Sequence, residues 1–252
     1  MVASAFIRQS ARPDVSHWDR KARSDFVTNI DREAEWLIGE TVMAALPDAR
    51  IVGEELTPAG ITADTDEVVW VVDPLDGTTN FLHDYPMYAV SVAAVQGGQP
   101  VAGVVVDVVR ELVYRSSAGG GAWRGKDRLR VSAVDEPALA LLGTGFPFKA
   151  PASERMDRYL RDFRRILPQT SGIRRGGSAA LDLAHVAEGK LDGFWELGLG
   201  AWDIAAGMLL VREAGGVVTD LAGGRAAVAA GDIVAGNPTV HEWLLGELAG
   251  GA

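Results

Sequence analysis

One short segment of the chain combines carboxylates, a glycine and hydroxyl side chains in a spacing that could bind both a metal and a phosphate. It reads Asp73-Pro74-Leu75-Asp76-Gly77-Thr78-Thr79-Asn80 and follows a Val- and Trp-rich stretch that predicts a buried strand over residues 67–72. We expect Pro74 to end this strand and Asp76 to return close to Asp73. Two carboxylates about 4 Å apart repel by roughly 4 kcal/mol at an effective dielectric of about 20. A hard divalent cation would turn that cost into a binding site, and oxygen ligands without thiols favour Mg²⁺ or Mn²⁺.

The second half of this segment suits a phosphate. Gly77 is followed by two hydroxyl residues at a predicted helix start, where backbone N–H groups lack helical partners and the helix dipole favours an anion. An isolated Asp-Pro-x-Asp-Gly fragment is more often a turn closed by an aspartate side chain. The full octapeptide after a buried strand favours a site where metal and phosphate meet.

Two further acidic positions stand at the ends of predicted elements. Glu54 and Glu55 follow a short predicted strand over residues 51–53, and Asp203 lies at the start of an apolar helix predicted over residues 202–214. Taken alone, the first is as often a solvated loop and the second a helix cap. Together with the octapeptide they predict one shared cation site.

The elements that must hold these groups follow from the apolar periodicity. A helix is predicted over residues 28–46, capped by Thr28 with Asp31 three residues later. Strands over residues 88–95 and 101–109 are joined at Gly97-Gly98, which indicates a hairpin. The second half alternates short strands and helices, so we expect stacked layers of sheets and helices in a mixed α/β fold. We place a boundary near residue 145, with residues 1–145 carrying the metal and phosphate segment and residues 146–252 completing the site.

Composition excludes several functional classes. The 252 residues include no cysteine, which rules out disulfides, thiolate zinc sites and a cysteine nucleophile, and which fits a reducing cytoplasm. With 24 basic and 34 acidic residues the net charge is −10, a poor basis for nonspecific binding to nucleic acid. No stretch approaches the roughly 20 apolar residues of a membrane span. We therefore expect a cytoplasmic protein without nucleic-acid or membrane partners.

At this point the sequence resembles a known family, the inositol monophosphatases. The likeness extends over roughly residues 20–245 and is carried by motifs in family order. Residues 72–81 are similar to the first signature and residues 202–216 to the second. Four further segments match the metal-binding glutamates, the mobile N-terminal loop with the first helix, and parts of the pocket: Gly53-Glu54-Glu55, residues 21–31, Gly176-Gly177-Ser178-Ala179-Ala180 and Glu196.

The resemblance implies a set of metal ligands. Asp73 would bridge two metal ions, Glu54 and the backbone carbonyl of Leu75 would help to hold the first, and Asp76 and Asp203 would complete the second. A third, weaker ion would lie near Glu54, which the family also implies to be catalytic. The cofactor implied is Mg²⁺, two or three ions, with Mn²⁺ as a substitute.

The resemblance also implies roles around the substrate. Thr78, paired with Asp31, would orient and deprotonate the attacking water, and the amides of Gly77 and Thr78 would hold the phosphate. Ala180 and Glu196, with Asp203 beside them, would contact the polyol. The implied fold is a layered α-β-α-β-α sandwich, and relatives are commonly lithium-sensitive homodimers.

The activity implied is Mg²⁺-dependent hydrolysis of a small polyol phosphate, with myo-inositol monophosphate as the first choice and metal-activated water as the nucleophile. Histidinol phosphate is the main alternative, and fructose 1,6-bisphosphate, nucleotide 3′-phosphates and NADP are others, because the pocket lining decides among them. A different class, a noncatalytic interaction protein that kept the fold, is disfavoured because no metal ligand is missing.

Overall fold

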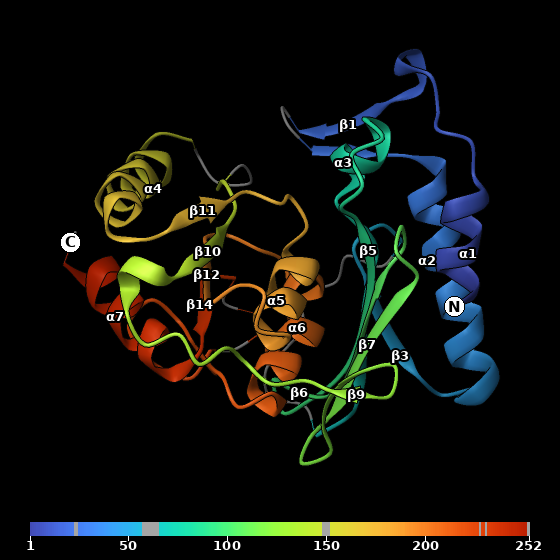
Figure 1. Cartoon of the computed structure of the whole chain (residues 1–252). Helices are drawn as coiled ribbons and strands as arrows, with labels where there is room; N and C mark the ends of the chain where they lie inside the picture. Colours follow the sequence, from blue (N-terminus) through green and yellow to red (C-terminus); the bar gives the residue numbers. More distant parts are fainter. Residues whose placement is uncertain (23–24, 57–65, 148–151, 227, 230, 251–252) are drawn as a thin grey trace.

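Two helices near the N-terminus cover part of one face of a seven-stranded sheet (Figure 1). The computed structural model describes all residues except 23–24, 57–65, 148–151, 227, 230 and 251–252. Helix α2, Asn29–Ala45, confirms the predicted first helix, and the expected cap is present because the Thr28 hydroxyl accepts the Ile30 N–H at 3.1 Å. Helix α1, Val2–Gln9, was not predicted from the sequence; it packs against α2 through Ala3 and Ile7.

The seven-stranded sheet runs in the order β3-β4-β5-β6-β7-β8-β9. Only the first pair, β3 and β4, is parallel; the others are antiparallel neighbours along the chain. The turn between β5 and β6 contains Gly97 and Gly98, both at positive φ, which confirms the predicted hairpin. The strands are β3 Arg50–Gly53, β4 Val69–Asp76, β5 Ala89–Gln96, β6 Gln99–Asp107, β7 Leu112–Ser117, β8 Gly121–Arg124 and β9 Asp127–Arg128.

A second, five-stranded sheet is built from the C-terminal half in the order β11-β10-β12-β14-β13. Strand β10 is parallel to both of its neighbours, whereas β14 is antiparallel to both of its own. These strands are short and alternate with helices, as the sequence predicts. Their bounds are β10 Leu141–Thr144, β11 Gly172–Arg174, β12 Gly193–Glu196, β13 Val217–Thr219 and β14 Ile233–Gly236.

Helices α5, Ala179–Ala187, and α6, Ala201–Glu213, lie between the two sheets (Figure 1). They contact both, and α6 is buried continuously from Asp203 to Val211, as a helix enclosed on all sides must be. Helices α7, Pro238–Ala249, and α4, Ala152–Ile166, cover the far face of the smaller sheet. The order of layers is therefore α-β-α-β-α, and the expected sandwich is confirmed.

A short hairpin and a short helix complete the N-terminal half. Strands β1, Asp19–Ala22, and β2, Asp25–Val27, pair antiparallel where the resemblance implies the mobile loop, and the side chains of residues 20–26 lie outside the described part of the structure. Helix α3, Thr78–Leu82, follows β4 directly. No helix of the described residues is both long and apolar enough to cross a membrane. The boundary near residue 145 stays a prediction.

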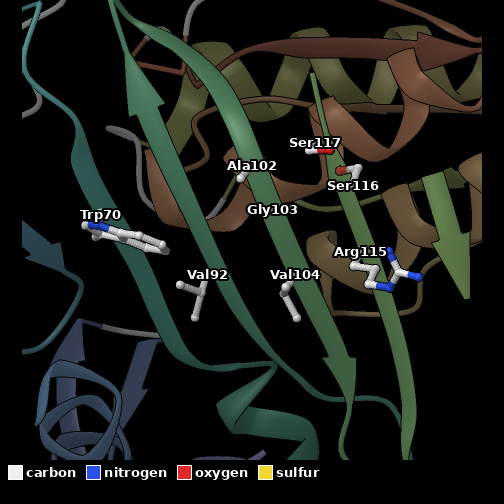
Figure 2. Close-up of a pocket in the computed structure, with 8 residues that line it drawn as sticks. All are labelled: Trp70, Val92, Ala102, Gly103, Val104, Arg115, Ser116 and Ser117. Carbon is white, nitrogen blue, oxygen red and sulfur yellow. The ribbon is translucent and has the colours of Figure 1, made fainter. Parts of the chain in front are cut away.

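The outer face of the larger sheet is hollowed where α1 and α2 do not cover it. A cavity of about 290 Å³ lies there over β4 to β7. Figure 2 shows the residues that line it. Cross-strand pairs form a row along its lining, from Val92 through Val104 to Arg115, and the row continues to Trp123. The Trp123 ring lies under the guanidinium groups of Arg115 and Arg128. None of the residues that the sequence marks for chemistry lines this cavity, so the functional site lies elsewhere.

Candidate functional site

Strand β4 delivers the two aspartates of the octapeptide from the interior of the larger sheet. Asp73 pairs with Ser91 of β5 and Asp76 with Ala89, so three steps on β4 face two on β5 and the strand bulges between them. The expectation that Pro74 ends the strand was wrong. Pro74 lies inside the bulge, a position that does not need a backbone N–H for pairing with β5. Strand β4 therefore continues to Asp76.

Three carboxylates from three separate elements converge beside this bulge. Oxygen atoms of Glu54, Asp73 and Asp203 all lie within 4.8 Å of one another. Glu54 arrives from the end of β3, where its N–H bonds the carbonyl of Val72 on β4 at 3.2 Å. Asp203 lies in the first turn of α6, where its carboxylate accepts the N–H of Gly200 at 2.6 Å. The sequence placed Glu54 and Asp73 at strand ends and Asp203 at a helix start, and the structure brings them together.

Burial and mutual repulsion act on these carboxylates together. The pKa of Asp73 lies well above its usual range because the side chain is buried and because Glu54, Asp76 and Asp203 are close. For Asp76, burial and the charge of Asp203 raise the pKa to about 7, although hydrogen bonds from Ser178 and Ala180 oppose the rise. In the absence of a cation, Asp73 and Asp76 therefore keep their protons at a higher pH than exposed aspartates do.

The donor set fits a hard divalent cation. Asp73 uses one oxygen to accept the N–H of Leu75 at 3.0 Å, while its buried Oδ2 accepts no hydrogen bond from the described residues. A buried carboxylate oxygen without a donor is costly, and a cation between Asp73, Glu54 and Asp203 would satisfy it. All three ligands offer oxygen, which suits Mg²⁺ or Mn²⁺.

Asp76 is held by the start of helix α5 rather than by solvent. Its Oδ2 accepts the Ser178 hydroxyl at 2.6 Å and the Ala180 N–H at 2.7 Å. Ser178 is also the N-cap of α5, so one hydroxyl group caps the start of the helix and holds the Asp76 carboxylate. Ala180 itself is fully buried, and the structure assigns its backbone to Asp76; the implied contact with substrate stays a prediction.

A hydroxyl relay lies beside the carboxylates. Thr78, the first residue of α3, donates from its hydroxyl toward Asp31 Oδ1 at 2.8 Å, with the carbonyl of Leu75 at 3.0 Å. Asp31 in turn accepts the N–H and the hydroxyl of Thr28 through Oδ2, at 2.8 and 2.6 Å. Burial raises the pKa of Asp31 despite these hydrogen bonds. The pair that the resemblance implies, Thr78 with Asp31, is therefore in direct contact.

Gly77 turns the chain from β4 into α3. Its φ of +95° is in the left-handed region, and a side chain there would place its Cβ 2.9 Å from the carbonyl oxygen of Met87. Only glycine fits both the angle and the space. The predicted helix start after Gly77 is confirmed, and the amides of Gly77 and Thr78 stay a prediction as phosphate ligands.

Two more buried acids lie on the side of the smaller sheet. Glu196 ends β12, and Asp182 lies in the first turn of α5. Burial raises the pKa of both well above the usual range, and a neighbouring acid raises it further in each case: Asp182 acts on Glu196, and Asp76 acts on Asp182. Arg175 opposes the rise at both. The structure thus extends the acidic site toward Glu196, whose implied contact with a polyol stays a prediction.

A sequence model of the inositol monophosphatase family matches residues 2–250. The chain belongs to the inositol monophosphatase family. Individual members differ in name. The chain is 46% identical over 241 residues to Nus factor SuhB of Pseudomonas aeruginosa, covering 94% of this chain and 88% of that protein. It is 43% identical over 225 residues to inositol-1-monophosphatase of Mesorhizobium japonicum, covering 89% and 83%.

Solved structures agree with this inositol monophosphatase assignment. The crystal structure of extragenic suppressor protein suhB from Bartonella henselae is similar at a TM-score of 0.90 and 37% identity, over 100% of this chain and 96% of that one. The family and its fold are thereby shown. Because the relatives carry different names, the comparisons do not identify the substrate, which is argued below from the site residues.

Sequence reasoning missed several groups that hold the site. Ser178 appears in the family motif without a role, although a serine before an apolar helix signals an N-cap. Glu35 lies one turn after Asp31 on the buried face of α2, beside Ala34 and Ile38. A charged residue at an apolar position of a helix is the signal that could have found it.

Proposed function

We propose that the chain is a Mg²⁺-dependent phosphomonoesterase that hydrolyses a small polyol phosphate, with myo-inositol monophosphate as the first substrate to test. The observation that carries this proposal is the convergence of Glu54, Asp73 and Asp203 within 4.8 Å around a buried oxygen that no described group satisfies. Such a cluster costs stability unless it holds a cation. Membership of a phosphatase family supports the same chemistry.

The metal ligands would be the ones that the resemblance implies. Glu54 and the carbonyl of Leu75 would hold one ion together with Asp73. Asp76 and Asp203 would hold a second, also together with Asp73. Bound there, divalent cations supply the positive charge that a phosphate ester needs for attack and lower the pKa of water. The number of ions, two or three, belongs to this proposal, as do lithium sensitivity and a homodimer.

Thr78 and Asp31 would prepare the nucleophile. The hydroxyl hydrogen of Thr78 is committed to Asp31 or to the Leu75 carbonyl, so its oxygen is left to accept a hydrogen bond from a water. That acceptor fixes the orientation of the water, and its proton can pass through the hydroxyl to Asp31. The raised pKa of Asp31 makes this carboxylate a better proton acceptor than an exposed aspartate.

The polyol would lie toward Glu196. This carboxyl group is 9% exposed at the end of β12 and can accept hydrogen bonds from substrate hydroxyls. The amides of Gly77 and Thr78 would face the phosphate, and Asp203 and Ala180 would border the sugar side. Histidinol phosphate remains the runner-up, because the same acidic surroundings would also accept an ammonium group.

Phosphate release from a substrate panel tests the proposal. The panel is myo-inositol 1-phosphate, histidinol phosphate, fructose 1,6-bisphosphate and adenosine 3′,5′-bisphosphate, each with Mg²⁺ and with EDTA. We expect Mg²⁺-dependent turnover, with the highest kcat/KM naming the substrate. Asp203→Asn should lose nearly all turnover and keep its fold by circular dichroism. Wild-type turnover that persists in EDTA, or unchanged turnover of Asp203→Asn, would contradict the metal assignment.

A second candidate function is that of a Nus factor, because the 46% identical relative carries that name. For this chain it would be a function of the interaction-protein class, and it would be separable from hydrolysis by a substitution in the acidic site. Asp203→Asn alters a side chain that is 6% exposed and leaves the outer surface intact. A Nus function that survives this substitution would be independent of the hydrolytic site.

A further inference from the structure

Helix α2 presents two buried carboxylates to the site, one turn apart. Asp31 bonds Thr78, as described, whereas Glu35 reaches the segment that follows β3. Glu35 is 3% exposed, and it accepts the N–H of Glu55 through Oε2 at 2.7 Å and the N–H of Leu56 through Oε1 at 2.9 Å. Both of its oxygens are therefore used, and both serve the backbone immediately after Glu54.

Gly53 provides the space that this carboxylate occupies. A side chain at Gly53 would place its Cβ on the carboxylate atoms of Glu35, although the φ of Gly53 is an ordinary negative one. The glycine is thus required by the neighbouring carboxylate rather than by the backbone angle. Gly53 and Glu35 form one unit: the missing side chain of the first admits the carboxylate of the second.

This unit fixes the backbone on both sides of a proposed metal ligand. The N–H of Glu54 bonds the carbonyl of Val72 on β4, and the next two N–H groups bond Glu35. Three consecutive amides are therefore held by two different elements. The fixed backbone sets the direction in which the Glu54 side chain leaves the chain, and its carboxylate lies beside Asp73 and Asp203.

We infer that Glu35 is a positioning residue for the metal site: it orients Glu54 toward Asp73 and Asp203 and thereby sets the affinity for the divalent cation. This inference rests on the proposed function, since it assigns a role within the same site. Because Glu35 and Asp31 lie on one face of α2, the same helix also fixes the distance between Glu54 and the Thr78 hydroxyl. Carboxylates that orient a metal ligand from behind typically change metal affinity by about 10–100-fold when they are removed.

Glu35 does not act as a metal ligand itself. Each of its oxygens accepts a backbone N–H, and both amides belong to residues beyond Glu54. Gln at this position has one acceptor oxygen and an NH₂ group that would oppose the second N–H. Glu35→Gln therefore removes one of the two hydrogen bonds while it preserves size and helix propensity.

Titration with Mn²⁺, followed by electron paramagnetic resonance of the free ion, tests the role in the purified full chain. We expect Glu35→Gln to bind Mn²⁺ about tenfold more weakly than wild type or more. The Mn²⁺ concentration for half-maximal turnover should rise by the same factor, whereas kcat at saturating Mn²⁺ should stay within about threefold of wild type. Glu33→Gln, an exposed glutamate on the same helix, is the matched control and should match wild type.

The outcomes separate this inference from the proposed function. Unchanged Mn²⁺ affinity in Glu35→Gln, with an active wild type, overturns only the positioning role. A loss of kcat that saturating Mn²⁺ does not restore also overturns it, because that result indicates a general structural defect. A wild-type chain that binds no Mn²⁺ overturns both.

A second variant keeps the test decisive if Glu35→Gln fails to fold in EDTA. Gly53→Ala keeps the glutamate at position 35, but the added methyl group pushes its carboxylate out of its present position. It should weaken Mn²⁺ binding to a similar extent while kcat at saturating Mn²⁺ is retained. Wild-type affinity in a folded Gly53→Ala chain overturns the inference.

Discussion

Replacing Asp76 by Asn would remove one negative charge from the carboxylate cluster and keep both hydrogen bonds that hold this side chain. The amide oxygen of Asn can still accept the Ser178 hydroxyl and the Ala180 N–H, which now reach Asp76 Oδ2 at 2.6 and 2.7 Å. The new NH₂ group takes the place of an oxygen in acidic surroundings, where it can donate. We therefore expect Asp76→Asn to stabilise the metal-free protein while it weakens metal binding.

The magnitude follows from the pKa of Asp76. Its pKa rises from the usual 3.8 to about 7, through burial first and the charge of Asp203 second. Each pH unit between these values corresponds to about 1.4 kcal/mol, so the ionised side chain destabilises the metal-free fold by about 4 kcal/mol. Because Asp73 and Asp203 share this repulsion, we expect Asp76→Asn to raise the unfolding free energy of the metal-free chain by about 2–4 kcal/mol at pH 8.

The sign of the pH dependence is fixed by the same pKa. The folded chain holds its proton on Asp76 up to about pH 7, and the unfolded chain releases it near 3.8. The metal-free wild type therefore loses stability as pH rises from about 4 to about 7, and the loss is constant above that range. The difference in unfolding free energy between Asp76→Asn and the wild type should therefore fall to about 1–2 kcal/mol at pH 5.

Urea unfolding in EDTA, followed by tryptophan fluorescence at pH 5 and pH 8, measures both effects. Asp157→Asn, at an exposed position on α4, is the control and should show neither. With Mn²⁺ in excess the order should reverse, because the wild-type cluster binds the ion more tightly and gains more stability from it. A variant that is less stable than wild type in EDTA at pH 8, or equally favoured at both pH values, would refute the reasoning.

Three further predictions concern Thr78 in the hydroxyl relay, Ser178 beside Asp76, and the turn at Gly77. Thr78→Ala should lower kcat by about 10²–10³-fold with little change in KM, whereas Thr78→Ser should keep most activity; equal kcat values for wild type and Thr78→Ala in steady-state phosphate release would exclude the relay. Ser178→Ala removes a hydrogen bond that favours ionised Asp76, so the pKa of Asp76 should rise above about 7. The pH at which half of the Mn²⁺ binding is lost should then move upward, and an unchanged pH profile of Mn²⁺ binding contradicts this prediction. Gly77→Ala should lose about 1–3 kcal/mol of unfolding free energy in urea, because φ is +95° and Met87 blocks the methyl group; unchanged stability would show that the turn adapts.

The positions of the site residues were largely predictable from the sequence, because each lies at the end of an element with a clear pattern. The cap at Thr28, the strand before Asp73 and the helix after Gly200 all carry local signals that the structure confirms. Their convergence was inferred from chemistry rather than from spacing, since no local pattern says which strand end meets which helix start. Family resemblance supplied the roles of these residues.

The features that sequence missed depend on contacts between distant segments. Pro74 was expected to end β4, but pairing with β5 accommodates it in a bulge, and this depends on the partner strand. Helix α1 is only eight residues long, and it is held by packing on α2 through Ile7 rather than by intrinsic propensity. The hydrogen bonds of Glu35 reach backbone 20 and 21 residues away, which no helical periodicity reveals.

The origin of the three clustered carboxylates has a consequence for how the molecule holds together. Glu54 and Asp73 belong to the larger sheet, whereas Asp203 begins a helix that packs between both sheets. A cation bound by all three would act as a cross-link between the early and late parts of the chain, one that is reversible and set by metal concentration. Binding should then merge the unfolding of the two sheets into a single transition and raise its midpoint, and protease cleavage of either half should slow as the metal concentration rises. During synthesis this cross-link cannot form until α6 has been made, so the nascent chain stays without a complete metal site until most of its fold is in place.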